Sequence, residues 1–140
     1  MSEDDVVNGS AAIGTDDETA IRALVHRYTM AIADRDADVW ASTWADDGVW
    51  DMGGRRSEGR DAVRATWEGA MARFVEVGHV ATFEELAIDQ TAGEATGRWT
   101  VEERTVDADG NEFAFTADYH DRYVRTPAGW RFAERRLQFH

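Results

Sequence analysis

Apolar side chains first recur at helical spacing between residues 21 and 32. These residues are Ile21, Leu24, Val25, Tyr28 and Ile32. A spacing of three or four residues places them on one face of a helix, which we expect to span about residues 16–34. Residues 1–14 are acidic, contain Gly and Ser, and show no such period. We therefore expect a disordered tail at 1–14, followed by a single domain at 15–140.

Two further helices are predicted in the first half of the chain. Asp36 is suited to cap a short second helix that extends to Trp44 and ends before the turn-like residues that follow. Residues 49–52 are typical of a short strand. Apolar positions between residues 61 and 74 return to helical spacing and predict a third helix.

The second half of the chain is patterned as sheet. Strand-rich stretches separated by turn-forming residues cover residues 79–89, 94–106, 111–125 and 130–139. In the third stretch, aromatic and polar residues alternate, so one face is apolar and carries Asp121. Long coiled strands under a layer of helices leave a hollow between the layers. We expect an α+β fold in which three N-terminal helices pack on a strongly curved, mixed, mostly antiparallel sheet, forming a cone-shaped barrel that encloses a pocket.

Charge and composition exclude several kinds of partner and cofactor. The chain has 15 basic and 28 acidic residues, and this net charge of −13 repels nucleic acid and anionic membranes. It has no cysteine, no histidines at metal-ligand spacing and no glycine-rich phosphate loop, so we expect no metal and no other cofactor. The N-terminus lacks the features of a signal peptide, which predicts a cytoplasmic protein.

A series of short motifs resembles the SnoaL-like domains of the nuclear transport factor 2-like superfamily. The motifs lie at residues 27–28, 34–36, 44–50, 59–63, 78–79, 95–99, 119–123 and 129–135. Within the superfamily, the pattern is most similar to cofactor-free lyases, namely scytalone dehydratase, bile-acid 7α-dehydratase and hexachlorocyclohexane dehydrochlorinase. The resemblance also implies a homodimer or homotrimer.

The lyases that the chain resembles use a dyad that corresponds by position to Asp34 and His79. An imidazole is suited to remove a proton next to a carbonyl, and a carboxylate on its other ring nitrogen orients it. The resemblance further implies roles for Tyr28 and for either Arg135 or its neighbour Arg136, which face opposite sides of a strand. On a helical wheel Asp34 lies about 120° from Tyr28, so the resemblance, and not the spacing, places Asp34 at the pocket.

These residues predict a cofactor-independent lyase, a dehydratase or related eliminating enzyme, that acts on a small cyclic or polyketide-like carbonyl compound. The expected substrate is hydrophobic or aromatic because aromatic side chains are expected to wall the pocket. The expected wall residues are Trp44, Trp50, Trp67, Trp99, Phe115, Tyr119 and Arg135.

Two alternatives stay open. Polyketide cyclases of the superfamily place an acid/base aspartate in a segment similar to that of Asp121, which would make the protein a cyclase or isomerase. Pairing with an arginine is the commoner role of such an acid on an apolar face. The other alternative is a non-catalytic domain that binds a hydrophobic ligand or serves in assembly.

Overall fold

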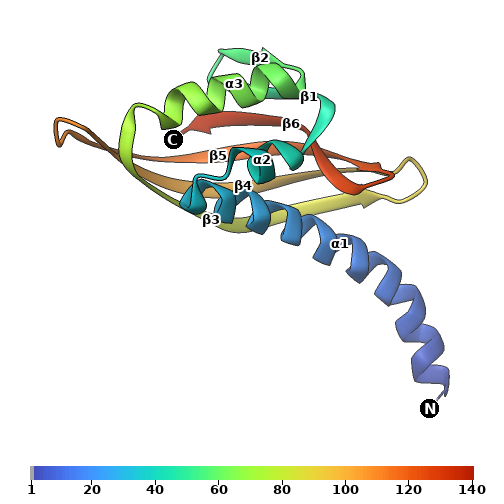
Figure 1. Cartoon of the computed structure of the whole chain (residues 1–140). Coiled ribbons are helices and arrows are strands. Elements are labelled where there is room, and N and C mark those ends of the chain that lie inside the picture. The colour runs from blue at the N-terminus through green and yellow to red at the C-terminus, as the bar shows by residue number, and fades with distance from the viewer. Residues whose placement is uncertain (1) are drawn as a thin grey trace.

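The computed structural model describes the backbone of residues 2–140 and the side chains of residues 16–140. Its elements, in chain order, are α1 (Ser2–Asp34), α2 (Ala37–Ser42), β1 (Trp44–Met52), β2 (Arg56–Glu58), α3 (Arg60–Met71), β3 (Phe74–Asp89), β4 (Glu94–Asp107), β5 (Glu112–Thr126) and β6 (Gly129–Phe139) (Figure 1). The α+β class is as predicted, and α1 ends where the pattern places its end. The disordered tail predicted at residues 1–14 lies outside the residues whose side chains the structure describes.

The strands form one six-stranded sheet in the order β2-β1-β6-β5-β4-β3. β1 runs parallel to β6, and the other neighbouring strands are antiparallel. Helix α1 packs against β3 and β6, and α3 packs against β1. Figure 1 shows α1 and α2 lying over one face of the sheet. The mixed, mostly antiparallel sheet under helices is the predicted arrangement.

The second helix is shorter than the pattern predicts. It ends at Ser42, and Trp44 begins β1. The Thr43 hydroxyl donates to the Trp40 carbonyl at 2.6 Å and closes the helix, while the Thr43 carbonyl accepts from the Phe132 amide at 2.9 Å. Pairing with β6 therefore draws this segment into the sheet, where tertiary contacts outweigh local helical spacing.

The third helix also ends early, and β3 begins before the predicted strand. Helix α3 ends at Met71 and β3 begins at Phe74. The Arg35 guanidinium donates to the carbonyls of both residues, at 3.2 Å to Met71 and 2.7 Å to Phe74. This arginine follows the end of α1 and holds the junction between α3 and β3. As a result, His79 lies within a strand and not at its first residue.

Aromatic rings fill the core between the helices and the sheet. Trp40 stacks on Trp67 with ring centroids 4.6 Å apart. Tyr28 and Trp44 each lie 5.4 Å from the ring of Phe132 on β6. Rings of this size bury roughly 150–250 Å² each, so they dominate the packing energy of a small domain. These contacts fix α1 and α2 over the sheet.

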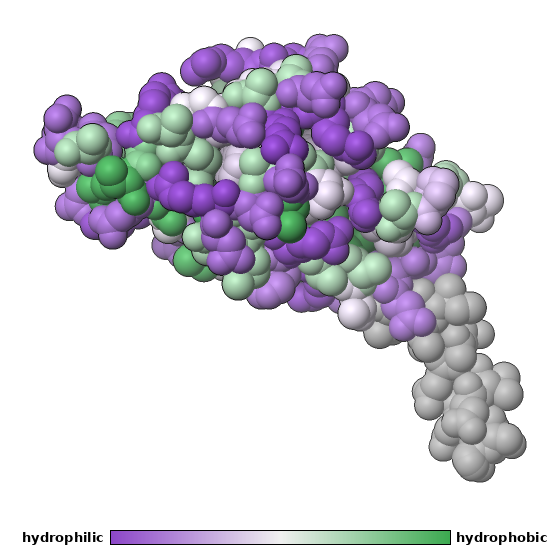
Figure 2. Space-filling model, in the orientation of Figure 1, coloured by the Kyte–Doolittle hydropathy of each residue, from purple (hydrophilic) through white to green (hydrophobic). Residues whose placement is uncertain are grey.

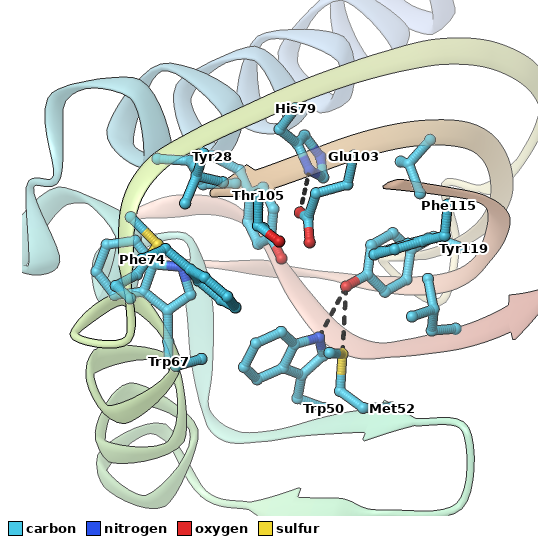
Figure 3. A pocket seen from close by; sticks show the side chains of 16 residues that line it. Tyr28, Trp50, Met52, Trp67, Phe74, His79, Glu103, Thr105, Phe115 and Tyr119 are labelled. Carbon is cyan, nitrogen blue, oxygen red and sulfur yellow. Dashed lines mark hydrogen bonds and ion pairs between the residues drawn. The ribbon is translucent and has the colours of Figure 1, made fainter. Parts of the chain in front are cut away.

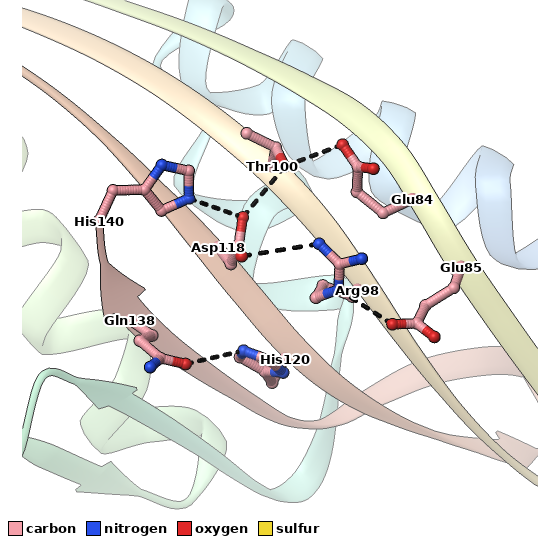
Figure 4. Close-up of polar contacts among 8 residues, drawn as sticks. All are labelled: Glu84, Glu85, Arg98, Thr100, Asp118, His120, Gln138 and His140. Atoms are coloured by element: carbon pink, nitrogen blue, oxygen red, sulfur yellow. Dashed lines mark hydrogen bonds and ion pairs between the residues drawn. The ribbon is translucent and has the colours of Figure 1, made fainter.

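The outer face of the sheet is polar. Figure 4 shows this face with helices behind it, and its ion pairs join Arg98 to Glu85 at 2.9 Å and His140 to Asp118 at 3.0 Å. Such exposed pairs contribute about 0.2–1 kcal/mol each. The alternation that exposes these side chains turns their apolar neighbours toward the helices.

Hydrophobic side chains reach the surface at the end of the sheet where β4 turns into β5. Phe113 and Val75 are exposed there, and Figure 2 shows hydrophobic residues gathered at this left-hand end of the molecule. Among the described residues, no helix combines the length and the apolar content that crossing a bilayer requires.

Candidate functional site

A small cavity of about 60 Å³ lies between the helices and the sheet (Figure 3). Residues from α1, β1, α3 and the strands β3 to β6 line it. Most of its wall is apolar, and the polar groups come mainly from Tyr28, His79, Glu103, Thr105 and Tyr119. A few polar groups that converge in an apolar pocket are the usual arrangement of a small-molecule site.

His79 and Glu103 form the central polar pair of this cavity. They lie directly opposite each other on β3 and β4. His79 Nδ1 is 3.0 Å from Glu103 Oε1, and the two side chains expose 4% and 24% of their surface (Figure 3). An ionised carboxylate only accepts hydrogen bonds, so the bond places the ring proton on Nδ1.

The second ring nitrogen of His79 is left free by this bond. Nε2 is buried and has no hydrogen-bond partner among the described residues. A buried polar atom without a partner costs about 1–3 kcal/mol, which makes such an atom at a cavity a marker of function. With the proton on Nδ1, Nε2 carries a lone pair and is able to act as a base.

Asp34 does not reach His79 in this structure. Its side chain is exposed at the C-terminal end of α1, and no hydrogen bond or ion pair of the described side chains joins it to His79. The helical wheel already placed Asp34 off the apolar face, and the helix keeps that geometry to its last residue. Glu103, on the strand beside His79, occupies the position of the orienting carboxylate instead.

Two tyrosines line the cavity beside the histidine. The Tyr28 ring centroid lies 6.0 Å from that of His79, and the Tyr119 hydroxyl accepts a hydrogen bond from Trp50 Nε1 at 3.0 Å. Burial raises the pKa of Tyr28 and raises that of Tyr119 well above its usual value. Both phenols are therefore neutral at physiological pH and able to donate a hydrogen bond to an oxyanion.

Asp121 is held in a closed pair with Arg135. Arg135 Nε donates to Asp121 Oδ1 at 2.8 Å, Arg135 Nη2 donates to Oδ2 at 3.1 Å, and the Tyr123 hydroxyl also donates to Oδ2 at 2.7 Å. Both side chains of the pair are fully buried, and neither lines the cavity. The expected arginine pairing is thus present, and Arg136 points outward.

Arg135 supports the cavity from behind one of its walls. Its guanidinium carbon lies 3.9 Å from the centroid of the Tyr119 ring. Cation–π contact of this kind contributes about 0.5–2 kcal/mol. The contact helps to fix the ring whose hydroxyl faces the cavity.

The expected aromatic walls are present in part. Trp50, Trp67, Phe115 and Tyr119 line the cavity. Trp44 packs within the core, and Trp99 donates to the Tyr123 hydroxyl at 3.0 Å, away from the cavity. Within residues 16–140, no group of three or more His, Asp or Glu side chains is arranged to hold a metal ion.

Glu103 is the site residue that sequence reasoning missed. Strand alternation places Val101, Glu103 and Thr105 on one face of β4, which was the available signal. The pairing of Glu103 with His79 depends on the register between β3 and β4, and no local pattern specifies that register.

The chain is similar to known proteins both in sequence and in structure. Residues 15–136 match the model of the SnoaL-like domain. No curated protein matches the sequence. An NTF2-like protein with a cystatin-like fold from Novosphingobium aromaticivorans is 25% identical, with a TM-score of 0.78 over 97% of this chain and 90% of that chain.

Two further solved structures carry the names of a dehydratase and a dehydrochlorinase. A candidate scytalone dehydratase from Novosphingobium aromaticivorans is 20% identical, with a TM-score of 0.77 over 100% of this chain and 89% of that chain. A hexachlorocyclohexane dehydrochlorinase is 20% identical, with a TM-score of 0.79 over 88% of this chain and 84% of that chain. At these identities the likeness shows the fold alone. The match over residues 15–136, together with this fold, means that the chain belongs to the SnoaL-like domain family and has a nuclear transport factor 2-like fold.

Proposed function

We propose that this protein is a cofactor-independent lyase that eliminates water or a related leaving group from a carbonyl compound. One observation carries the proposal: His79 Nε2 is buried without a partner at an aromatic cavity, while Glu103 holds Nδ1. The combination supplies an oriented base in a site that excludes water, which is what proton removal from carbon requires.

The proposed reaction begins with proton transfer from the carbon next to the carbonyl to His79 Nε2. The electron pair of that C–H bond moves to the carbonyl oxygen and gives an enolate, to which the hydroxyl of Tyr28 or Tyr119 donates a hydrogen bond. Collapse of the enolate forms the C=C bond and expels hydroxide from the β-carbon. The imidazolium returns its proton to that hydroxide, and water leaves.

Glu103 has two roles in this scheme. Its carboxylate fixes the ring proton on Nδ1 before the reaction, and its negative charge stabilises the imidazolium that forms during the reaction. A positioned general base contributes about 10²–10⁴-fold to a rate, so His79 and Glu103 together account for a large share of the proposed catalysis.

The names of the similar structures agree with this reaction class, since a dehydratase and a dehydrochlorinase both eliminate a small molecule. They support the proposal only through the shared fold. The residues that carry it here are different from the predicted dyad, because Glu103 replaces Asp34 as the partner of His79.

The test uses a panel of β-hydroxy ketones in heavy water. Formation of the conjugated enone is followed by absorbance, and deuterium at the α-carbon of recovered substrate is followed by mass spectrometry. We expect His79→Gln to lower both rates about 10²–10⁴-fold. His120→Gln is the matched control, because His120 lies on the outer face and bonds Gln138 at 3.0 Å.

Equal rates for the wild type and His79→Gln would contradict the proposal. If panel compounds bind to the wild type without enone formation or deuterium exchange, the cavity serves as a non-catalytic ligand site.

A further inference from the structure

A second, larger cleft opens beside the cavity, between α3 and the β1–β2 hairpin. Its volume is about 500 Å³, and Trp50, Met52 and Ala70 line both spaces. Figure 1 shows α3 beside β1 and β2 at this place. Small residues of α3 leave the cleft open, and a Cβ atom added at Gly69 would meet nothing within 4 Å.

The wall of this cleft is basic in a chain whose net charge is −13. Arg55, Arg56 and Arg73 line it, and no Asp or Glu side chain is among its described lining residues. The positive charge of Arg56 is balanced by several carboxylates, including those of Asp51 and Glu134, each at 3.6 Å. Arg55 and Arg73 are exposed, and neither takes part in an ion pair between described side chains. Two positive charges in the cleft are thus available to a ligand.

Hydroxyl groups and an aromatic ring complete the cleft. The Ser57 and Thr66 hydroxyl oxygens lie 2.7 Å apart on its wall. The Arg73 guanidinium carbon lies 5.7 Å from the centroid of the Phe74 ring, and Phe74 lines the smaller cavity. The basic wall therefore begins where the apolar cavity ends.

Met52 lies on the boundary between the two spaces. Figure 3 shows its side chain beside Trp50 and Tyr119, and its sulfur is 3.7 Å from the Tyr119 hydroxyl. Methionine is unbranched and has three rotatable bonds, so its side chain is able to move aside at little cost. Such a movement would join the small cavity to the larger cleft.

We propose that the substrate carries an anionic group, a carboxylate or a phosphate, that binds Arg55 and Arg73 while its reacting carbons enter the smaller cavity. This inference rests on the proposed function, because it assigns the reacting end of the substrate to His79. The inference also accounts for the sizes of the two spaces. The cavity of about 60 Å³ holds only the reacting atoms of a substrate, and the cleft of about 500 Å³ holds the rest of the molecule. The proposed substrate class becomes anionic carbonyl compounds, which narrows the hydrophobic or aromatic carbonyl compounds that the sequence predicts.

The test compares the binding of cinnamate with that of its uncharged methyl ester, measured by calorimetry on the full chain. The two probes share the same ring and conjugated carbonyl and differ in one charge. We expect the wild type to bind cinnamate about tenfold more tightly than the ester, since two arginines contribute about 1.4 kcal/mol. This preference should weaken as salt is raised, because both arginines are exposed.

Variants of the arginines test whether the preference for cinnamate over its ester arises in the cleft. The double variant Arg55→Gln/Arg73→Gln should bind cinnamate and its ester equally. Arg136→Gln is the matched control, since this arginine is also exposed but lies outside both cavities, and it should keep the preference. Thermal unfolding of each variant verifies that the proteins are folded.

Competition identifies the kind of anion. If inorganic phosphate displaces cinnamate at lower concentration than acetate does, the site selects phosphate; the reverse order assigns a carboxylate. The inference is overturned if cinnamate does not bind, if the wild type binds both probes equally, or if the double variant keeps the preference.

The His79→Gln variant separates this inference from the proposed function. It should keep the tenfold preference for cinnamate because its cleft is intact. If the wild type shows this preference but no elimination activity, the anion site is supported and the lyase proposal is contradicted. His79-dependent turnover of neutral ketones, together with equal binding of cinnamate and its ester by the wild type, would contradict the anion site and support the lyase.

Discussion

Two pairs of a carboxylate and a nitrogen-bearing side chain bridge neighbouring strands of this sheet, one partly buried and one fully buried, and they differ in which atoms lack a hydrogen-bond partner. Glu103 faces His79 across β3 and β4, and Asp121 faces Arg135 across β5 and β6. In the second pair, two guanidinium bonds and the Tyr123 hydroxyl engage both carboxylate oxygens. Arg135 Nη1 also lacks a partner among the described residues, but a guanidinium nitrogen is a donor and offers no lone pair. In the first pair, one bond holds the ring and His79 Nε2 has no partner among the described residues.

This difference supports a structural role for the Asp121–Arg135 pair and the catalytic role proposed for the His79–Glu103 pair. A closed buried ion pair has no unoccupied base for a substrate, and removal of one partner leaves a charge stranded in the core. An open pair at a cavity retains an unused lone pair, and its loss strands no charge. We therefore expect variants of the two pairs to affect different measurements.

The largest expected effect follows from breaking the closed pair. Asp121→Ala strands the fully buried Arg135 guanidinium, which should lower the free energy of unfolding by about 3–5 kcal/mol. Urea unfolding followed by tryptophan fluorescence measures this. The control is Asp118→Ala on the same strand, where the ion pairs are partly exposed and the loss should stay below about 1 kcal/mol. Equal losses would mean that the buried pair is not structural.

Breaking the open pair should instead affect turnover. Glu103→Gln keeps the side-chain shape but no longer fixes the proton on His79 Nδ1, so the elimination rate should fall about 100-fold, within the range of general-base catalysis. The stability loss should remain about 0.5–1.5 kcal/mol, the contribution of one hydrogen bond. Unchanged turnover with a large stability loss would make this pair structural as well.

Two tryptophans sharpen the comparison at a smaller energy. Trp50 donates to Tyr119 at the cavity, and Trp99 donates to Tyr123 beside the closed pair, each at 3.0 Å. Trp50→Phe and Trp99→Phe should each lower stability by about 1–2 kcal/mol, from one lost hydrogen bond and a smaller ring. Only Trp50→Phe should also weaken cinnamate binding. An equal effect of both variants on binding would remove the distinction between the two regions.

The smallest effect, absent at neutral pH, concerns ionisation of the tyrosines. The chain has three, Tyr28, Tyr119 and Tyr123, and burial raises the pKa of each. Unfolded tyrosine loses its proton near pH 10, whereas the folded protein holds it, so stability is full below about pH 10 and falls as pH rises further. Phenolate absorbance should therefore appear together with unfolding. Ionisation of a tyrosine in the folded protein near pH 10 would contradict the burial of these rings.

Local sequence pattern accounts for most of the fold, and the family resemblance accounts for one half of the candidate dyad, His79. Helical spacing predicted α1, and strand-rich stretches between turn-forming residues predicted the long strands. Both patterns depend on residues close in the chain. The early end of α2 depends instead on a bond from Phe132 to Thr43 across the sheet, which local spacing does not encode.

The partner of His79 was not predictable for the same reason. Asp34 was expected from resemblance, but a helix residue keeps the direction that its place on the wheel gives it, and Asp34 is exposed. Glu103 meets His79 only because β3 and β4 pair in one register. Which of Arg135 and Arg136 faces the interior also depends on the register of the strand. A shift of one residue would bury Arg136 and expose Arg135.

The most direct test of the proposed reactive pair is the position of the proton on the His79 ring, measured by nitrogen NMR on the wild type. The ring nitrogens report which one carries the proton. The open pair predicts a proton on Nδ1, hydrogen-bonded to Glu103, and an unprotonated Nε2 whose signal shifts when cinnamate fills the cavity. A proton on Nε2, or a ring that exchanges freely between the two tautomers, would contradict the account.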